Sequence, residues 1–87
     1  MIKRWTDAAW SDYVWWQGQD RKTLKRINQL VEAIERDPFE GMGKPEPLRG
    51  VLAGTWSRRI DAKNRIIYSV EGEEVTFYSV KNHYGDR

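Results

Sequence analysis

Apolar residues recur at helical spacing in two segments of the N-terminal half of the chain. In the first segment, one largely apolar face is formed by residues at intervals of three or four: Trp10, Tyr13, Val14 and Gln17. Thr6 has the hydroxyl that a helix N-cap requires, and Gly18 is a residue type that commonly ends helices. The pattern predicts a helix that follows Thr6 directly and ends near Gly18.

The second segment has a longer apolar stripe with charged residues mostly on the other faces. Its apolar positions are Leu24, Ile27, Leu30, Val31 and Ile34. Asp20 is placed to cap the start of this helix. Pro38 stops it, because the residue before a proline, here Asp37, is driven out of the helical conformation.

The second half of the chain changes to the alternating pattern of β-strands. Residues 55–61 and 65–71 alternate around a turn at 62–64, and a further turn at 71–74 leads into a third strand at 75–80. Successive strands joined by short turns predict an antiparallel meander.

Two further segments complete the predicted fold. Residues 2–5 can form another strand, and residues 38–50 hold all three prolines and three of the seven glycines, which predicts a loop. We therefore expect an α+β fold and a single domain, residues 1–87. Two N-terminal helices would pack on a curved, mainly antiparallel sheet of four or five strands.

Length and composition exclude several classes of protein. A chain of 87 residues has a small core, which favours a surface cleft over a wide cavity. No run of about 18 uncharged apolar residues occurs, and no apolar signal-peptide core follows the first basic residues, so we expect a cytoplasmic protein without a membrane span. The chain has no Cys and one His, which excludes disulfides, thiolate zinc sites and His-rich metal sites. Five Trp residues suggest that some rings lie at an interface.

The net charge of +2 hides a basic segment in the middle of the chain. Residues 44–70 contain six basic residues and two acidic ones, whereas the last 17 residues are net acidic. A basic segment of this kind is typical of proteins that bind a polyanion such as nucleic acid. A mixed, solvated surface remains an equally good interpretation of the charge alone.

Glu46 and His83 are candidates for acid–base chemistry. Glu46 lies between Pro45 and Pro47, which restrict its backbone and leave its side chain on a stiff loop within the basic segment. A fixed carboxylate among cations fits a general base for a phosphate-bearing substrate, although a lone Glu is usually an ordinary surface residue. His83 is the only side chain suited to proton transfer near neutral pH, and the sequence leaves open whether it meets Glu46.

Three arginines flank the turn at 61–64. Of Arg58, Arg59 and Arg65, at least one pair faces the same surface of the sheet whatever the register. A two-residue loop separates Arg59 from Arg65, whereas a bulge or a five-residue loop brings them together. The register stays open, as does the alternative that these arginines form cross-strand pairs with acidic residues.

The sequence favours chemistry without a metal or another cofactor. The run Gly41-Met42-Gly43-Lys44 lacks the spacing of a phosphate-binding Walker loop, and Glu40 and Glu46 are the only acidic residues of the loop region. RNA offers a metal-free route, in which its own 2′-OH attacks the adjacent phosphate. That reaction needs a base, an acid and cations for the charged transition state, which Glu, His and Arg can supply.

Six sequence runs are spread over nearly the whole chain. They are W-S-D-Y-V-W-W-Q, R-I-N-Q-L, P-F-E-G-M-G-K-P-E-P-L, W-S-R-R-I, R-I-I-Y and H-Y. In these runs, and most specifically in the third, the chain resembles the YoeB (Txe/YoeB) branch of the RelE-like toxins of bacterial toxin–antitoxin modules. The resemblance implies a ribosome-dependent endoribonuclease that cleaves mRNA in the A site. It also implies a homodimer and a cognate YefM- or Phd-like antitoxin whose flexible C-terminal segment wraps the toxin.

The resemblance further implies roles for individual residues. Glu46 would be the general base, His83 the general acid, Arg65 the stabiliser of the phosphate and transition state, and Tyr84 a positioning or base-stacking residue. Arg59 would be a further phosphate contact. The other basic residues that we expect to bind substrate are Lys44, Arg49 and Arg58, with Arg49 at a position where relatives often carry Lys. We expect the dimer contact to involve the first helix or its neighbours.

A non-catalytic module that binds RNA or the ribosome and acts by occlusion is the alternative from another class. Replacement of Glu46 by Gln separates the two, because it abolishes the function of a catalytic base and leaves an occluding protein unaffected. The codon preference, the antitoxin's identity, the host and the inducing stress are not encoded in any pattern described above. The effect of the last three residues, which extend past the usual end of relatives, is also open.

Overall fold

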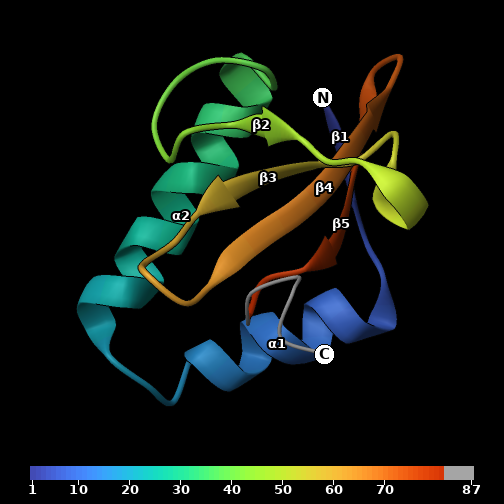
Figure 1. Ribbon diagram of the computed structural model, residues 1–87. Helices are drawn as coiled ribbons and strands as arrows, with labels where there is room; N and C mark the ends of the chain where they lie inside the picture. The colour runs from blue at the N-terminus through green and yellow to red at the C-terminus, as the bar shows by residue number, and fades with distance from the viewer. Residues whose placement is uncertain (82–87) are drawn as a thin grey trace.

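The computed structural model describes residues 1–81 (Figure 1). In chain order their elements are β1 (Ile2–Trp5), α1 (Asp7–Trp16), α2 (Arg21–Arg36), β2 (Glu46–Pro47), the 3-10 helix η1 (Gly50–Leu52), β3 (Trp56–Arg59), β4 (Arg65–Glu71) and β5 (Glu74–Ser79). The strands form one sheet in the order β1-β5-β4-β3-β2, in which β1 runs parallel to β5 and the other neighbours are antiparallel. The predicted α+β fold is confirmed, with five strands.

Local chemistry sets the ends of both helices. The Thr6 hydroxyl accepts a hydrogen bond from the N–H of Ala9 (3.0 Å), and the Asp20 carboxylate accepts from the N–H groups two and three residues further on. At the other end of α2, Asp37 adopts an extended conformation immediately before Pro38. The predicted caps and the predicted stop are therefore confirmed.

The core lies between α2 and one face of the sheet (Figure 1). Its fully buried members on the helix are Ile27, Leu30 and Ile34, and its fully buried members on the central strands are Ile66, Tyr68, Val75 and Phe77. Alternation along β4 directs Ile66 and Tyr68 toward α2 and their neighbours toward the opposite face. The amphipathic stripe that the sequence predicts for α2 is the surface that it buries.

The first helix packs through different residues from those of its predicted apolar face. Ala9 and Trp16 are buried, whereas the side chains of Trp10 and Val14 are about half exposed (52% and 50%). Helical spacing identifies a stripe of apolar residues, but only the neighbouring elements determine which stripe is covered. On this helix the sheet covers one side, and the tryptophan-rich side remains accessible.

The prediction of a continuous loop over residues 38–50 is wrong at one point. Glu46 and Pro47 form the short edge strand β2, paired with Ser57 and Trp56 of β3. Prolines normally argue against a strand, but an edge strand tolerates a residue without an N–H on its outer side. The pairing continues briefly, with the N–H of Leu48 donating to the carbonyl of Thr55 (2.9 Å).

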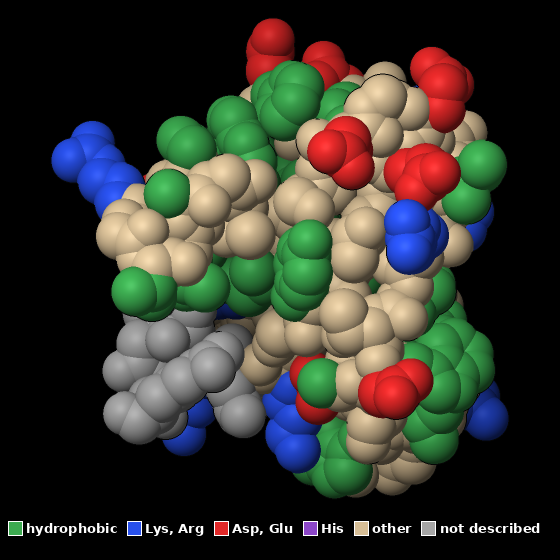
Figure 2. Space-filling model, turned by 90° about the vertical axis from the view of Figure 1, so that its right-hand side faces the viewer, with side chains coloured by type: hydrophobic (Ala, Val, Ile, Leu, Met, Phe, Trp, Pro, Cys, Tyr) green, Lys and Arg blue, Asp and Glu red, His purple; other side chains and the backbone are tan. Residues whose placement is uncertain are grey.

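The face of the sheet that is turned away from α2 is here called the distal face. Its residues on β2, β3 and β4 are Glu46, Ser57, Arg59, Arg65, Ile67 and Ser69, since directly opposed residues of antiparallel strands share a face. On this side of the molecule acidic side chains gather near the β4–β5 turn, at the top of Figure 2. Arg59 and Arg65 lie at the opposite ends of their strands from that turn. Among the described residues, no helix is long and apolar enough to cross a membrane.

Candidate active site

Three of the predicted site residues lie on the distal face. Glu46 of β2 is opposite Ser57 of β3, and Arg59 of β3 is opposite Arg65 of β4. Ser57 and Arg59 are two residues apart on one strand and therefore project from the same face. Opposed residues of antiparallel strands have Cβ atoms about 5 Å apart and diagonal neighbours about 7–8 Å apart. The register thus brings one carboxylate and two guanidinium groups together on adjacent strands.

The connection between β3 and β4, residues 60–64, sets this register. Its first two N–H groups both donate to the carbonyl of Asn64 (2.9 and 3.3 Å). The Asp61 carboxylate accepts hydrogen bonds from the backbone N–H groups two and three residues further on (2.8 and 2.7 Å), which closes a tight turn. Of the registers that the sequence left open, the structure has the one in which Arg59 is opposite Arg65.

Arg65 is held by the same turn. Its side chain is largely buried, with 8% exposed, and its Nη1 donates to the carbonyls of Asp61 (2.7 Å) and Asn64 (3.1 Å). Burial pushes the pKa of the Asp61 carboxyl upward. The hydrogen bonds from Asn64 and Lys63 and the charge of Arg65 outweigh this effect and keep that pKa below its usual value. Arg65 is therefore fixed in place, whereas Arg59 opposite it is exposed.

Glu46 is exposed, and within residues 1–81 no side chain hydrogen-bonds to or pairs with its carboxylate. Pro45 and Pro47 fix the backbone on both sides of it. Together with Pro47, Leu48 and Arg49 it lines a cavity of about 470 Å³. The carboxylate is thus presented from a rigid backbone beside a hollow large enough for part of a ligand.

Lys44 and Arg49 lie on either side of β2, and both are exposed. Lys44 has a left-handed backbone conformation (φ 52°), which directs the chain from the preceding loop into the strand. Arg49 immediately precedes η1, and its side chain makes no capping hydrogen bond there. Arg49 lines the cavity beside Glu46, and Lys44 is an exposed cation two residues before Glu46 in the chain.

Arg58 is not part of the accessible surface, so the expectation that it contacts substrate needs correction. It has no exposed area, and its guanidinium donates to Tyr68 Oη and to carbonyls of residues 37–42. The reason is the alternation of side chains along β3. With Arg59 on the distal face, Arg58 must face α2 and the core.

His83 and Tyr84 lie outside the described residues. The chain that leads to them is held by α1, because the indole N–H of Trp16 donates to the carbonyl of Val80 (2.7 Å) and the Asp12 carboxylate accepts from the Val80 N–H (3.0 Å). β5 runs antiparallel to β4 and therefore toward the end of β4 at which Arg65 lies. The sequence reasoning did not identify Asp12 or Trp16. The signal that could have identified Trp16 is that a buried tryptophan needs a hydrogen-bond acceptor for its indole N–H.

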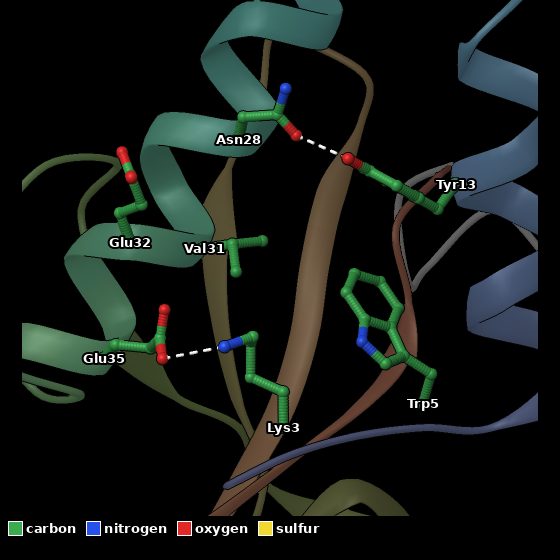
Figure 3. Close-up of a pocket in the computed structure, with 7 residues that line it drawn as sticks. All are labelled: Lys3, Trp5, Tyr13, Asn28, Val31, Glu32 and Glu35. Atoms are coloured by element: carbon green, nitrogen blue, oxygen red, sulfur yellow. Dashed lines mark hydrogen bonds and ion pairs between the residues drawn. The ribbon is translucent and has the colours of Figure 1, made fainter. Parts of the chain in front are cut away.

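A second hollow, of about 360 Å³, lies between α1, α2 and β1 (Figure 3). Its walls include Trp5 and Tyr13, whose hydroxyl donates to Asn28 (2.7 Å), and its rim carries an ion pair between Lys3 and Glu35 (2.9 Å). Lys3 and Trp5 project from the α2 side of the sheet, so this groove is separate from the Glu46 and Arg65 face. Within residues 1–81 no group of three His, Cys, Asp or Glu side chains is arranged to hold a metal ion.

Two helices on a five-stranded mixed sheet of this topology form the fold of the RelE and YoeB toxins. Residues 5–84 match the family described as "YoeB-like toxin of bacterial type II toxin-antitoxin system". The chain belongs to this family. It is 49% identical to the toxin YoeB of Synechocystis over 79 residues, which are 91% of this chain and 92% of that protein.

Solved structures agree with this assignment. The "YoeB/ParE toxin" of Agrobacterium tumefaciens superposes with a TM-score of 0.91 and 42% identity, covering 97% of this chain and 100% of that one. A YoeB dimer from Staphylococcus aureus gives a TM-score of 0.88 at 38% identity, covering 97% and 98% of the two chains. YoeB in a heterotetrameric YoeB–YefM toxin–antitoxin complex from the same organism gives 0.87 at 38% identity, with the same coverage.

Proposed function

We propose that this toxin is a ribosome-dependent endoribonuclease of the cytoplasm that cleaves mRNA in the A site and so inhibits translation. The observation that carries the proposal is the common face of Glu46, Arg59 and Arg65. A carboxylate without a partner in residues 1–81, beside guanidinium groups on the neighbouring strands, suits a substrate whose reacting group is a phosphate.

The proposed reaction has two proton transfers, one from the attacking 2′-OH and one to the leaving 5′ oxygen. Glu46 takes the proton of the 2′-OH, and the 2′ oxygen attacks the adjacent phosphorus. The bond to the 5′ oxygen then breaks, and His83 supplies the proton that this leaving oxygen needs. The products are a 2′,3′-cyclic phosphate on one fragment and a 5′-OH on the other.

Arginine side chains stabilise the negative charge that develops on the phosphate. Arg65 is held by the 60–64 turn through Nη1, and no residue in 1–81 bonds to its Nε or Nη2. A guanidinium fixed at one edge is preorganised to stabilise the transition state with its remaining donors. Arg59, Arg49 and Lys44 are exposed cations that would bind flanking phosphates, and Tyr84 would stack on or position a base.

Analysis of the product ends tests this mechanism. Wild-type protein incubated with programmed ribosomes should leave a 2′,3′-cyclic phosphate or a 3′-phosphate at the upstream fragment. The reaction needs no metal bound to the toxin, but ribosomes themselves require magnesium, so chelation is a poor test. A 3′-hydroxyl end would exclude attack by the 2′-OH.

We also propose that a YefM- or Phd-like antitoxin neutralises this toxin. A flexible antitoxin segment would wrap the toxin, with acidic side chains meeting the exposed Arg59 and Arg49, which lie toward opposite ends of β3. Charge reversal at Arg49 and Arg59 should slow association and weaken its dependence on salt. An unchanged association rate would exclude the electrostatic part of this proposal.

The toxin should form a homodimer through α1. Trp10 and Val14 are one helical turn apart and half exposed, and Trp10 packs on Trp5 at the wall of the groove in Figure 3. In analytical ultracentrifugation Trp10→Glu should give monomers. The matched control is Val51→Glu, which introduces the same charge at a fully exposed apolar residue of η1 and should leave the dimer intact. A dimer that survives Trp10→Glu would exclude this face.

A further inference from the structure

We propose that Arg58 and Tyr68 are positioning residues that hold the loop leading to Glu46 against the sheet. The loop consists of residues 37–43 and is here called the anchored loop. The inference rests on the proposed function, in which Glu46 is the general base. It gives the buried Arg58 a part in catalysis without any contact to substrate.

The guanidinium of Arg58 binds the anchored loop at several points. Its Nη1 donates to the carbonyl of Met42 (3.1 Å), and its Nη2 donates to the carbonyls of Asp37 and Glu40, the latter at 2.9 Å. Its Nε donates to the hydroxyl of Tyr68 (3.1 Å). Every nitrogen of the group is therefore used, and three of its four acceptors are backbone carbonyls of one loop.

Tyr68 adds a further bond to the same loop. Its hydroxyl accepts from Arg58 and donates to the carbonyl of Pro38 (2.6 Å). The pKa of Tyr68 is raised above its usual value because the side chain is buried, although the hydrogen bond and the charge of Arg58 act in the opposite direction. The hydroxyl therefore keeps the proton that its bond to Pro38 requires.

The charge of Arg58 makes these bonds difficult to release. Its side chain is fully buried, and within residues 1–81 the only ion pairs are Lys3–Glu35 and Arg4–Glu74. Backbone carbonyls solvate this cation in place of a carboxylate. One of them belongs to Asp37, the C-cap of α2, where the helix dipole is negative. Departure of the loop would remove three of the four acceptors of this charged group, which is unfavourable.

The anchored loop leads directly to Glu46. The carbonyl of Gly43 accepts from the N–H of Arg59 (2.6 Å), and only Lys44 and Pro45 lie between this contact and the carboxylate. A Cβ atom added to Gly43 would lie 3.1 Å from the Cβ of Arg58, so the loop passes β3 at close range. A displacement of the loop is therefore transmitted to the general base through two residues.

The test compares Tyr68→Phe with Tyr78→Phe. The first removes the hydroxyl that bonds the anchored loop, and the second removes an exposed hydroxyl bonded to Ser69 (2.9 Å). The first readout is single-turnover cleavage of ribosome-bound mRNA, as maximal rate and half-saturating toxin concentration. The second is amide hydrogen exchange of residues 37–46, which requires no activity.

Tyr68→Phe should lower the maximal rate at least about tenfold, because a misplacement of about 1 Å can cost about 100-fold. It should leave the half-saturating concentration unchanged and accelerate exchange of residues 37–46. Tyr78→Phe should behave as wild type in all three measurements. Arg58→Lys, which keeps the charge but cannot reach several carbonyls, should lower the rate further.

A general loss of stability is separated from positioning by Ile27→Val, a core substitution on α2 at a residue that makes none of the hydrogen bonds to the anchored loop. It should lower the melting temperature without changing the rate or the exchange of the loop. The inference is overturned if Tyr68→Phe cleaves at the wild-type rate, if exchange of residues 37–46 is unchanged, or if Ile27→Val loses as much activity. A wild-type protein that does not cleave would exclude the proposed function, while the exchange measurement would still decide whether Tyr68 holds the loop.

Discussion

Replacement of Gly43 by Ala measures how closely the anchored loop is pressed against its neighbours. Gly43 has a φ of 87°, and an added Cβ would lie 2.7 Å from Leu30 Cδ2, 3.1 Å from the Cβ of Arg58 and 3.3 Å from the carbonyl oxygen of Arg59. Gly54 has a similar φ of 95° and nothing within 4 Å of an added Cβ. The two substitutions thus share the backbone strain, and only Gly43→Ala adds a steric clash.

The expected magnitudes follow from these two contributions. A left-handed conformation costs an alanine about 1–2 kcal/mol, of which reduced freedom of the unfolded chain offsets about 0.5 kcal/mol. The end of Leu30 can rotate away, but the contacts with Arg58 and Arg59 involve β3 itself, and such overpacking costs about 1–3 kcal/mol. Gly54→Ala should therefore lower the free energy of unfolding by about 1 kcal/mol, and Gly43→Ala by about 2–4 kcal/mol.

Urea denaturation followed by tryptophan fluorescence gives both free energies, and single-turnover cleavage gives the functional consequence. Because the loop can relieve the clash only by moving away from β3, Gly43→Ala should also cleave more slowly at a temperature where it is folded. Gly54→Ala should cleave at the wild-type rate. Equal losses of stability in the two variants would refute the close packing of the loop, and an unimpaired rate in Gly43→Ala would refute its link to Glu46.

Two further substitutions test the supports of the site. Hydrogen bonds and Arg65 outweigh burial and keep the pKa of Asp61 below its usual 3.8, so ionised Asp61 stabilises the fold above that pH, and this contribution disappears as the pH falls through the lowered pKa. In Asp61→Ala the free energy of unfolding should therefore fall less steeply with pH in that range. An unchanged pH dependence of the free energy of unfolding would contradict this prediction. Trp16→Phe leaves the buried Val80 carbonyl without its donor and should lower the free energy of unfolding by about 1–3 kcal/mol in urea denaturation, whereas an unaltered midpoint would show that this bond is dispensable.

Features governed by a few neighbouring residues could be predicted from the sequence. The caps at Thr6 and Asp20 and the stop at Pro38 depend on bonds and clashes within one helical turn, which residue type alone determines. The α2 stripe was predictable for a similar reason, because its hydrophobic periodicity is strong and uninterrupted. Family motifs then identified the fold, which the solved structures confirm.

Features that depend on pairing between distant segments could not be predicted in the same way. The face of the sheet on which the Arg58 side chain lies follows from the register that the 60–64 connection sets between β3 and β4. A shift of this register by one residue would place Arg58 on the distal face and Arg59 on the α2 side. The strand at Glu46 can be recognised only from its pairing with β3, since prolines on both sides of Glu46 make the local sequence unlike that of a strand. The accessible side of α1, with Trp10 exposed, is likewise set by the sheet and not by the helix itself.

Glu46 remains a predicted base, and its removal is the most direct test of the account. Glu46→Gln keeps the size of the side chain and deletes the proton acceptor, while Glu40→Gln makes the same change at an exposed position earlier in the same segment. With ribosome-bound mRNA, Glu46→Gln should lower the single-turnover rate by about 10²–10⁴ and bind the ribosome with wild-type affinity, and Glu40→Gln should match the wild type in both. If Glu46→Gln cleaves at the wild-type rate, Glu46 is not the base; if the wild type and Glu46→Gln both block translation without cutting mRNA, the toxin acts by occlusion.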